Sequence, residues 1–211
     1  MKIALLGAES TGKTRLAGEL AARLREQGQS AAVVPEVLRE WCRREGRAPR
    51  PEEQLPIAAE QERRVDEAAQ SNAIVVADTT ALMVAIYSGM LFEDGALYRF
   101  ALARQRHYDR TLVTGLDLPW MPDGLQREGP QVRKEVDSLV RKALTDAGVA
   151  FRVVYGHGDD RLAKALAAVD AGVGAAAFNP AGRQWKWVCD KCSDPQCELR
   201  LFNFQGRSAT T

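Results

Sequence analysis

One segment near the N-terminus has the residue types and the spacing of a phosphate-binding loop. Residues 7–14 read GAESTGKT, a complete G-x-x-x-x-G-K-[ST] pattern between an apolar strand pattern and a helical one. Glycines let backbone N–H groups surround phosphate oxygens, and the N-terminus of the following helix adds the positive end of its dipole. A chance glycine-rich turn is the alternative, but every fixed position and both flanking elements match. The segment therefore predicts a nucleotide site.

Two side chains of this loop have expected roles in handling ATP. Lys13 should reach the β- and γ-phosphates and be largely exposed without nucleotide, and Thr14 should offer its hydroxyl to Mg²⁺. The predicted nucleotide contacts are Gly7, Ala8, Glu9, Ser10, Thr11, Gly12, Lys13, Thr14 and Arg15. ATP and Mg²⁺ are the expected cofactors.

A second apolar run, residues 74–77, ends in Asp78. A carboxylate at the end of such a strand is typical of a residue that holds Mg²⁺ directly or through water. The alternative is an ordinary N-cap of the helix that begins near Thr80. We expect Asp78 to be a metal ligand and a catalytic residue.

A third run, residues 31–34, leads into Pro35 and Glu36. This order places a carboxylate at the C-terminal edge of the sheet, where the sites of α/β proteins lie. Glu36 is the candidate base, or a positioning acceptor, for a substrate hydroxyl. The alternative is a first-turn glutamate favoured by the dipole of the helix 37–44.

The segment 117–130 contains three prolines and two glycines, which predicts a long loop of the kind that forms lids. Arg127 and Arg133 are candidate catalytic contacts to the transferring phosphoryl group, although arginines commonly lie on solvated helix faces. Trp120 would either stack on an aromatic base or hold the loop against the body of the domain.

These residues require a scaffold of alternating strands and helices. Apolar runs of strand length alternate with segments of helical period, which implies crossover connections and a parallel sheet covered on both faces. The expected strands are 2–6, 31–34, 73–77, 110–114 and 151–154, and the expected helices are 14–26, 37–44, 52–70, 81–90, 132–147 and 161–169. The prediction is an α/β fold with a doubly wound, parallel, five-stranded sheet of the P-loop NTPase type.

Composition narrows the class of protein further. The chain has 211 residues, of which 45% are hydrophobic and 27% charged, as in ordinary globular domains. The chain has 29 basic and 28 acidic residues, so no strong electrostatic field favours binding of nucleic acid or an anionic membrane. No apolar run has the length of a membrane span or a signal peptide. We expect a cytoplasmic protein.

The C-terminal segment has a different composition from the rest of the chain. We expect a P-loop domain over residues 1–170, a small-residue linker over 171–184, and a cysteine- and aromatic-rich tail over 185–211. In that tail, Cys189, Cys192 and Cys197 form C-x₂-C-x₄-C, which predicts either one structural Zn²⁺ or reduced thiols. The fourth zinc ligand would come from Cys42, His157, Asp194 or a second chain. A protein partner for the tail is a further hypothesis.

The motifs also separate the classes of P-loop protein. A GTPase should have glycine where Ala81 stands, and N-K-x-D is absent. An AAA-type motor would need a helical lid and an arginine from a neighbouring subunit, for which about 170 residues leave little room. A small-molecule kinase fits best.

Four segments together resemble a known family. GAESTGKT (7–14), VVPEVLREW (33–41), IVVADTT (74–80) and YDRTLVTGLDLPWMPDGLQREG (108–129) are similar to the ribosylnicotinamide kinase domain family of the bacterial NAD-biosynthesis regulator NadR and its P-loop kinase and AAA-like ATPase relatives. The resemblance covers about residues 2–169. Because the first strand begins at residue 2, we expect the upstream DNA-binding and adenylyltransferase parts of full-length relatives to be missing.

The resemblance implies phosphoryl transfer from ATP to the 5′-hydroxyl of nicotinamide riboside. It implies that Asp78 binds the metal, that Glu36 contacts the acceptor, and that Arg127 and Arg133 contact phosphate. Two alternatives stay open, a kinase for another small acceptor and an ATP-dependent switch or adaptor.

Overall fold

The computed structural model describes residues 1–91, 95–121 and 129–171, which all belong to the compact unit Met1–Ala177. A five-stranded sheet forms its centre, with strand order β2-β3-β1-β4-β5 and every pairing parallel. The strands are β1 (Lys2–Leu6), β2 (Ala31–Val34), β3 (Ile74–Asp78), β4 (Arg110–Thr114) and β5 (Arg152–Val154). The helices are α1 (Lys13–Glu26), α2 (Val37–Glu45), α3 (Pro51–Ser71), α4 (Ala81–Leu91), α5 (Gly95–Gln105), α6 (Gly129–Asp146) and α7 (Gly158–Asp170). The predicted fold class is confirmed.

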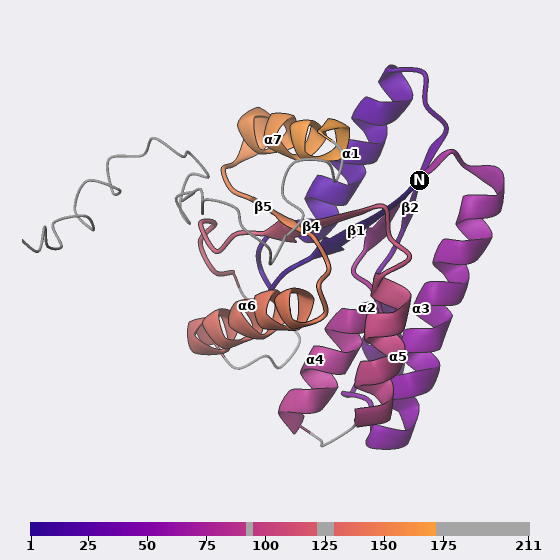
Figure 1. Ribbon diagram of the computed structural model, residues 1–211. Helices are drawn as coiled ribbons and strands as arrows, with labels where there is room; N and C mark the ends of the chain where they lie inside the picture. The colour runs from indigo at the N-terminus through magenta and orange to yellow at the C-terminus, as the bar shows by residue number, and fades with distance from the viewer. Residues whose placement is uncertain (92–94, 122–128, 172–211) are drawn as a thin grey trace, which may run out of the picture. The chain divides into compact units, whose positions relative to one another are not determined.

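Helices cover both faces of the sheet, and Figure 1 shows α1 and α7 on one face and α3 to α6 on the other. Side chains alternate along a strand, so β1 sends Ile3 and Leu5 to the α1/α7 face and Ala4 and Leu6 to the opposite face. All four are fully buried. This double burial explains why the strands are continuous apolar runs in the sequence.

The structure differs from the sequence prediction in one helix and in several boundaries. The helix α5 was not predicted, because apolar residues surround its axis and leave no single apolar stripe for periodicity to detect. The predicted helices at 132 and 161 begin earlier, as α6 at Gly129 and α7 at Gly158. Among the described residues, no helix combines the length and the apolar character that crossing a membrane requires.

The topology determines where a ligand would lie. Crossovers place β2 and β3 on one side of β1, and β4 and β5 on its other side. The loop after β1 therefore lies where the chain changes sides, which is the usual position of ligands in open α/β sheets. Residues that follow β1, β2 and β3 meet at this edge, including Gly7, Glu36 and the strand-end residue Asp78.

Candidate functional site

The loop between β1 and α1 needs glycine at two positions. Gly7 has φ 138° and Gly12 has φ 73°, both in the range that favours glycine. A Cβ at Gly7 would lie 2.2 Å from Thr114 Oγ1, so β4 also excludes a side chain there. These two requirements account for both fixed glycines of the motif.

Hydroxyl groups hold this loop in its curved conformation. The Thr11 hydroxyl donates to the Ala8 carbonyl at 2.7 Å, and its oxygen lies 2.7 Å from Thr114 Oγ1. Ser10 Oγ donates to the Met121 carbonyl at 3.0 Å and accepts from the Met121 amide at 2.7 Å. These bonds fix the curve of the loop and join it to the segment after β4.

Lys13 does not project into solvent as expected, because the residue is only 6% exposed. The ammonium Nζ folds back and donates to the Ala8 carbonyl at 2.6 Å within the loop. This bond satisfies a buried charge, which would otherwise be costly to desolvate. Lys13 nevertheless lies in the loop where phosphates are expected.

Asp78 and Thr14 come together across the loop. Thr14 Oγ1 donates to Asp78 Oδ2 at 2.6 Å, and Asp78 Oδ1 is buried without a hydrogen-bond partner. Burial raises the pKa of Asp78, the Thr14 hydroxyl opposes this, and the charge of Glu36 adds to the increase. A hydroxyl and an unsatisfied carboxylate oxygen fit the oxygen ligands that Mg²⁺ prefers.

The capping role considered for Asp78 is taken by other residues. Thr80 Oγ1 accepts from the Leu82 amide at 3.2 Å, and Glu62 Oε1 accepts from the Ala81 amide at 2.9 Å. These bonds satisfy free N–H groups in the first turn of α4. The carboxylate of Asp78 bonds to Thr14 instead.

Glu36 occupies the N-cap position of α2, yet its side chain makes no capping bond. The Val37 amide is bound instead by Gln61 Oε1 of α3 at 2.9 Å. Glu36 is buried, and Arg39 Nε donates to its Oε2 at 3.1 Å. The carboxylate is therefore positioned by a neighbouring arginine at the same sheet edge as Asp78.

Arg133 is buried, so it does not lie on a solvated helix face. Its Nη2 donates to the Leu118 carbonyl at 2.8 Å, which joins α6 to the segment after β4. Trp120 in that segment is half-buried, and its stacking role stays a prediction. Arg127 lies outside the described residues.

Arg161 was missed by sequence reasoning, since a single arginine in the first turn of a helix gives no signal. It is buried, and its Nη2 donates to the Thr11 carbonyl of the phosphate loop at 2.8 Å. Burial lowers the pKa of Arg161, nearby Asp117 and Glu19 oppose this, and the charge of Arg133 lowers it further. The Nε atoms of Arg133 and Arg161 are both buried without a hydrogen-bond partner. Two cationic groups therefore lie near each other beside the loop.

A carboxylate within the loop itself forms a further contact. Glu9 is 3% exposed, and its Oε2 accepts from the Tyr87 hydroxyl of α4 at 3.1 Å. Its other oxygen, Oε1, is buried without a partner. The motif places Glu9 among the predicted nucleotide contacts but does not require a carboxylate there, because any residue satisfies this position.

The zinc prediction concerns Cys189, Cys192 and Cys197, which lie outside the described residues. Within the described ranges, no group of three or more His, Cys, Asp or Glu side chains could hold a metal ion. Zinc in the tail therefore stays a prediction.

Comparison with known proteins adds a family and a set of similar folds. Residues 2–161 match a family described as an AAA domain. A structure titled as NadR protein in complex with NR is 20% identical with a TM-score of 0.66, covering 86% of this chain and 54% of that one. A structure of NadR in complex with NAD and AMP-PNP is 17% identical with a TM-score of 0.63, covering 88% and 51%.

The chain thus spans about half the length of these NadR structures. A thymidylate kinase from Ehrlichia chaffeensis is 15% identical with a TM-score of 0.58, covering 81% of this chain and 98% of that one. Comparison with curated proteins gave no match. The resemblance seen in the sequence is confirmed for family and fold, and the chain belongs to the AAA domain family of P-loop proteins.

Proposed function

We propose that this protein is an ATP-dependent kinase that phosphorylates the 5′-hydroxyl of a riboside, with nicotinamide riboside as the first candidate. The observation that carries the proposal is the pairing of two carboxylates at one sheet edge. Asp78 contacts Thr14 of the phosphate loop, and the buried Glu36 lies close enough to raise the pKa of Asp78. A phosphoryl donor and a hydroxyl acceptor need these two kinds of group next to each other.

On the donor side, Lys13 would exchange the Ala8 carbonyl for oxygens of the β- and γ-phosphates. The exchange replaces one acceptor with a charged and stronger one, so it favours the nucleotide-bound state. Thr14 and Asp78 would hold Mg²⁺, which supplies neutralisation of phosphate charge when bound. Arg133 and Arg161 place further positive charge beside the same loop.

On the acceptor side, Glu36 would accept the proton of the riboside hydroxyl as its oxygen attacks the γ-phosphorus. The bond between that phosphorus and the β-γ bridging oxygen breaks, and ADP leaves with the electron pair. The bond from Arg39 keeps the Glu36 carboxylate oriented before the substrate binds. For nicotinamide riboside, the product would be nicotinamide mononucleotide.

The structures with similar folds suggest a first and a second candidate acceptor. One NadR structure is titled as a complex with NR, and the sequence motifs of residues 7–14 and 108–129 resemble the same family. The thymidylate kinase has a similar fold, which makes a different nucleoside or nucleotide acceptor the second candidate.

The test is a panel of acceptors scored by mass spectrometry for the ATP-dependent gain of one phosphate. The panel contains nicotinamide riboside, the common ribosides and deoxyribosides, and thymidylate. We expect ATP consumption that depends on the acceptor and is fastest with nicotinamide riboside. Slow ATP hydrolysis at the same rate with every acceptor would contradict the proposal and favour a nucleotide-dependent switch.

A further inference from the structure

The Glu9 carboxylate is half satisfied in the protein. Tyr87 donates to Oε2 at 3.1 Å, while Oε1 has no hydrogen-bond partner although the residue is 3% exposed. Burying a carboxylate oxygen without a donor is costly, and such atoms in folded proteins commonly have a functional explanation. Glu9 Oε1 is therefore an acceptor that is left for a donor from outside the protein.

The contacts of Glu9 identify the side of the loop to which its carboxylate turns. Its partner Tyr87 belongs to α4 and packs on the core cluster that also contains Ala8, Val37 and Leu38. That cluster lies on the face of the sheet opposite α1 and α7. Glu9 is thus directed to the same side as α2, which begins after Glu36, whereas Arg161 approaches the loop from the other side.

A phosphate group does not fit as the hydrogen-bond donor to Glu9 Oε1. Phosphate oxygens near neutral pH are anionic acceptors, so they would repel Glu9 rather than satisfy Oε1. A hydroxyl group can donate to a carboxylate, and a bond to a charged acceptor is among the stronger hydrogen bonds. A sugar hydroxyl of the acceptor meets this requirement on the Glu36 side of the loop.

We propose that Glu9, held by Tyr87, is a specificity-determining residue that accepts a hydrogen bond from the 2′- or 3′-hydroxyl of the acceptor's ribose. This inference rests on the proposed kinase function and specifies its substrate class as intact ribosides. The loop glutamate would then serve the acceptor, in contrast to the nucleotide role that its place in the motif suggests.

The experiment compares a riboside accepted in the panel with its 2′-deoxy and 3′-deoxy analogues. We expect the wild-type protein to lose about 10- to 100-fold in kcat/KM with one analogue, the loss expected for a hydrogen bond to a charged group. Glu9→Ala should react equally with that analogue and with the intact riboside, at the lower rate. Tyr87→Phe should reduce the discrimination, because the carboxylate loses the bond that holds it.

The matched control is Glu52→Ala, which removes an exposed carboxylate at the start of α3. This variant should discriminate between the riboside and its analogue as the wild type does. The dissociation constant for ATP, measured by calorimetry, should be the same in all four proteins, and equal melting temperatures would show that the fold is kept.

Two results would overturn the inference. Full discrimination in Glu9→Ala would mean that another residue reads the sugar, and a loss of ATP affinity as large as the loss of acceptor affinity would make Glu9 a nucleotide contact. A wild-type protein that phosphorylates no acceptor would contradict the proposed function alone. Calorimetric binding of nicotinamide riboside and its analogues to wild type and Glu9→Ala, with a non-hydrolysable ATP analogue present, would then still decide the role of Glu9.

Discussion

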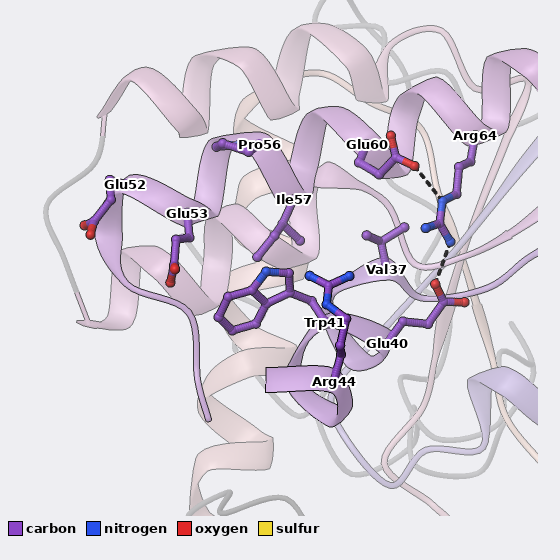
Figure 2. Close-up of a pocket in the computed structure, with 10 residues that line it drawn as sticks. All are labelled: Val37, Glu40, Trp41, Arg44, Glu52, Glu53, Pro56, Ile57, Glu60 and Arg64. Atoms are coloured by element: carbon purple, nitrogen blue, oxygen red, sulfur yellow. Dashed lines mark hydrogen bonds and ion pairs between the residues drawn. The ribbon is translucent and has the colours of Figure 1, made fainter. Parts of the chain in front are cut away.

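The phosphate-loop edge and the groove between α2 and α3 differ in how their charged side chains are buried and paired. At the loop edge, Glu9 and Asp78 are almost fully buried, and each has one carboxylate oxygen without a partner. In the groove, of about 410 Å³, the charged groups are exposed or half-buried, and most of them form ion pairs. Figure 2 shows Arg64 between Glu60 and Glu40, at 2.8 and 2.6 Å.

Trp41 and Glu53 of the groove also have a charged partner within the protein. The Arg47 guanidinium lies 4.8 Å from the centroid of the Trp41 ring, and Glu53 binds the same arginine through both carboxylate oxygens. Exposed ion pairs of this kind contribute little to stability and require no ligand. Hollow shape alone therefore does not indicate function here, whereas the phosphate-loop edge combines a recognisable motif with buried carboxylate oxygens that have no partner.

The largest expected effect comes from the loop lysine. Lys13→Ala should reduce phosphoryl transfer about 1000-fold or more, because it removes a positive charge from the developing negative charge of the phosphoryl group. The melting temperature should change little, since Lys13 bonds within its own loop. The control is Lys164→Ala in α7, where the exposed lysine pairs only with Asp160 among the described residues. Wild-type turnover in Lys13→Ala would contradict the assignment of residues 7–14 as a phosphate-binding loop.

Glu36, the N-cap of α2, and Glu40, within α2, give the most direct comparison of the two regions. Glu36→Gln should lower kcat about 100- to 10,000-fold with little change in ATP affinity, as expected for loss of a general base. Glu40→Gln, one turn later in the groove, removes the same charge and should leave kcat unchanged. Steady-state kinetics with ATP and the best acceptor measures both variants. Equal losses in the two variants would mean that the charge of α2, and not the position of Glu36, matters.

Arg161 should have a smaller effect that acts through the nucleotide. Its Nη2 supports the Thr11 carbonyl, so Arg161→Gln should loosen the loop and weaken ATP binding about tenfold, the value of one charge-assisted hydrogen bond. Arg44→Gln on the groove side is the control, since its exposed guanidinium pairs with Glu45. Isothermal titration of ATP compares the two variants. Unchanged affinity in Arg161→Gln would leave this arginine with a purely structural role.

The sequence predicted the parts of the site that follow from local rules. A glycine pattern after a strand locates the loop, and an acidic residue at the end of an apolar run locates Asp78 and Glu36, because parallel strands bring their carboxyl ends to one edge. Arg161 and Tyr87 depend instead on contacts 150 and 78 residues away in sequence. No local spacing encodes such contacts. Similarly, α5 has no apolar stripe that a local pattern could detect, and it packs against α4 and α3 in the structure.

The smallest expected effect is a difference in pH dependence between the groove and the buried network near α4. Arg63 and Arg64 lower the pKa of Glu60 to about 2, whereas burial raises the pKa of Glu62, against opposing bonds from Ala81, Tyr108 and Arg104. A lowered folded-state pKa stabilises the protein above the unfolded value of 4.5, and this stability disappears as the pH falls toward 2. A raised pKa has the opposite sign, since stability is lost as the pH rises above 4.5 through the folded value.

Urea unfolding between pH 3 and 7 measures both contributions on Glu60→Gln and Glu62→Gln. Glu60→Gln should lower the free energy of unfolding by less than about 1 kcal/mol near neutral pH, because its ion pairs are open to solvent, and its difference from wild type should shrink as the pH falls to 3. The free energy of unfolding of Glu62→Gln should increase relative to wild type as the pH rises, since glutamine avoids burying a charge. Parallel pH profiles in the two variants would contradict the contrast, and they would place Glu62 in the same solvated environment as the groove.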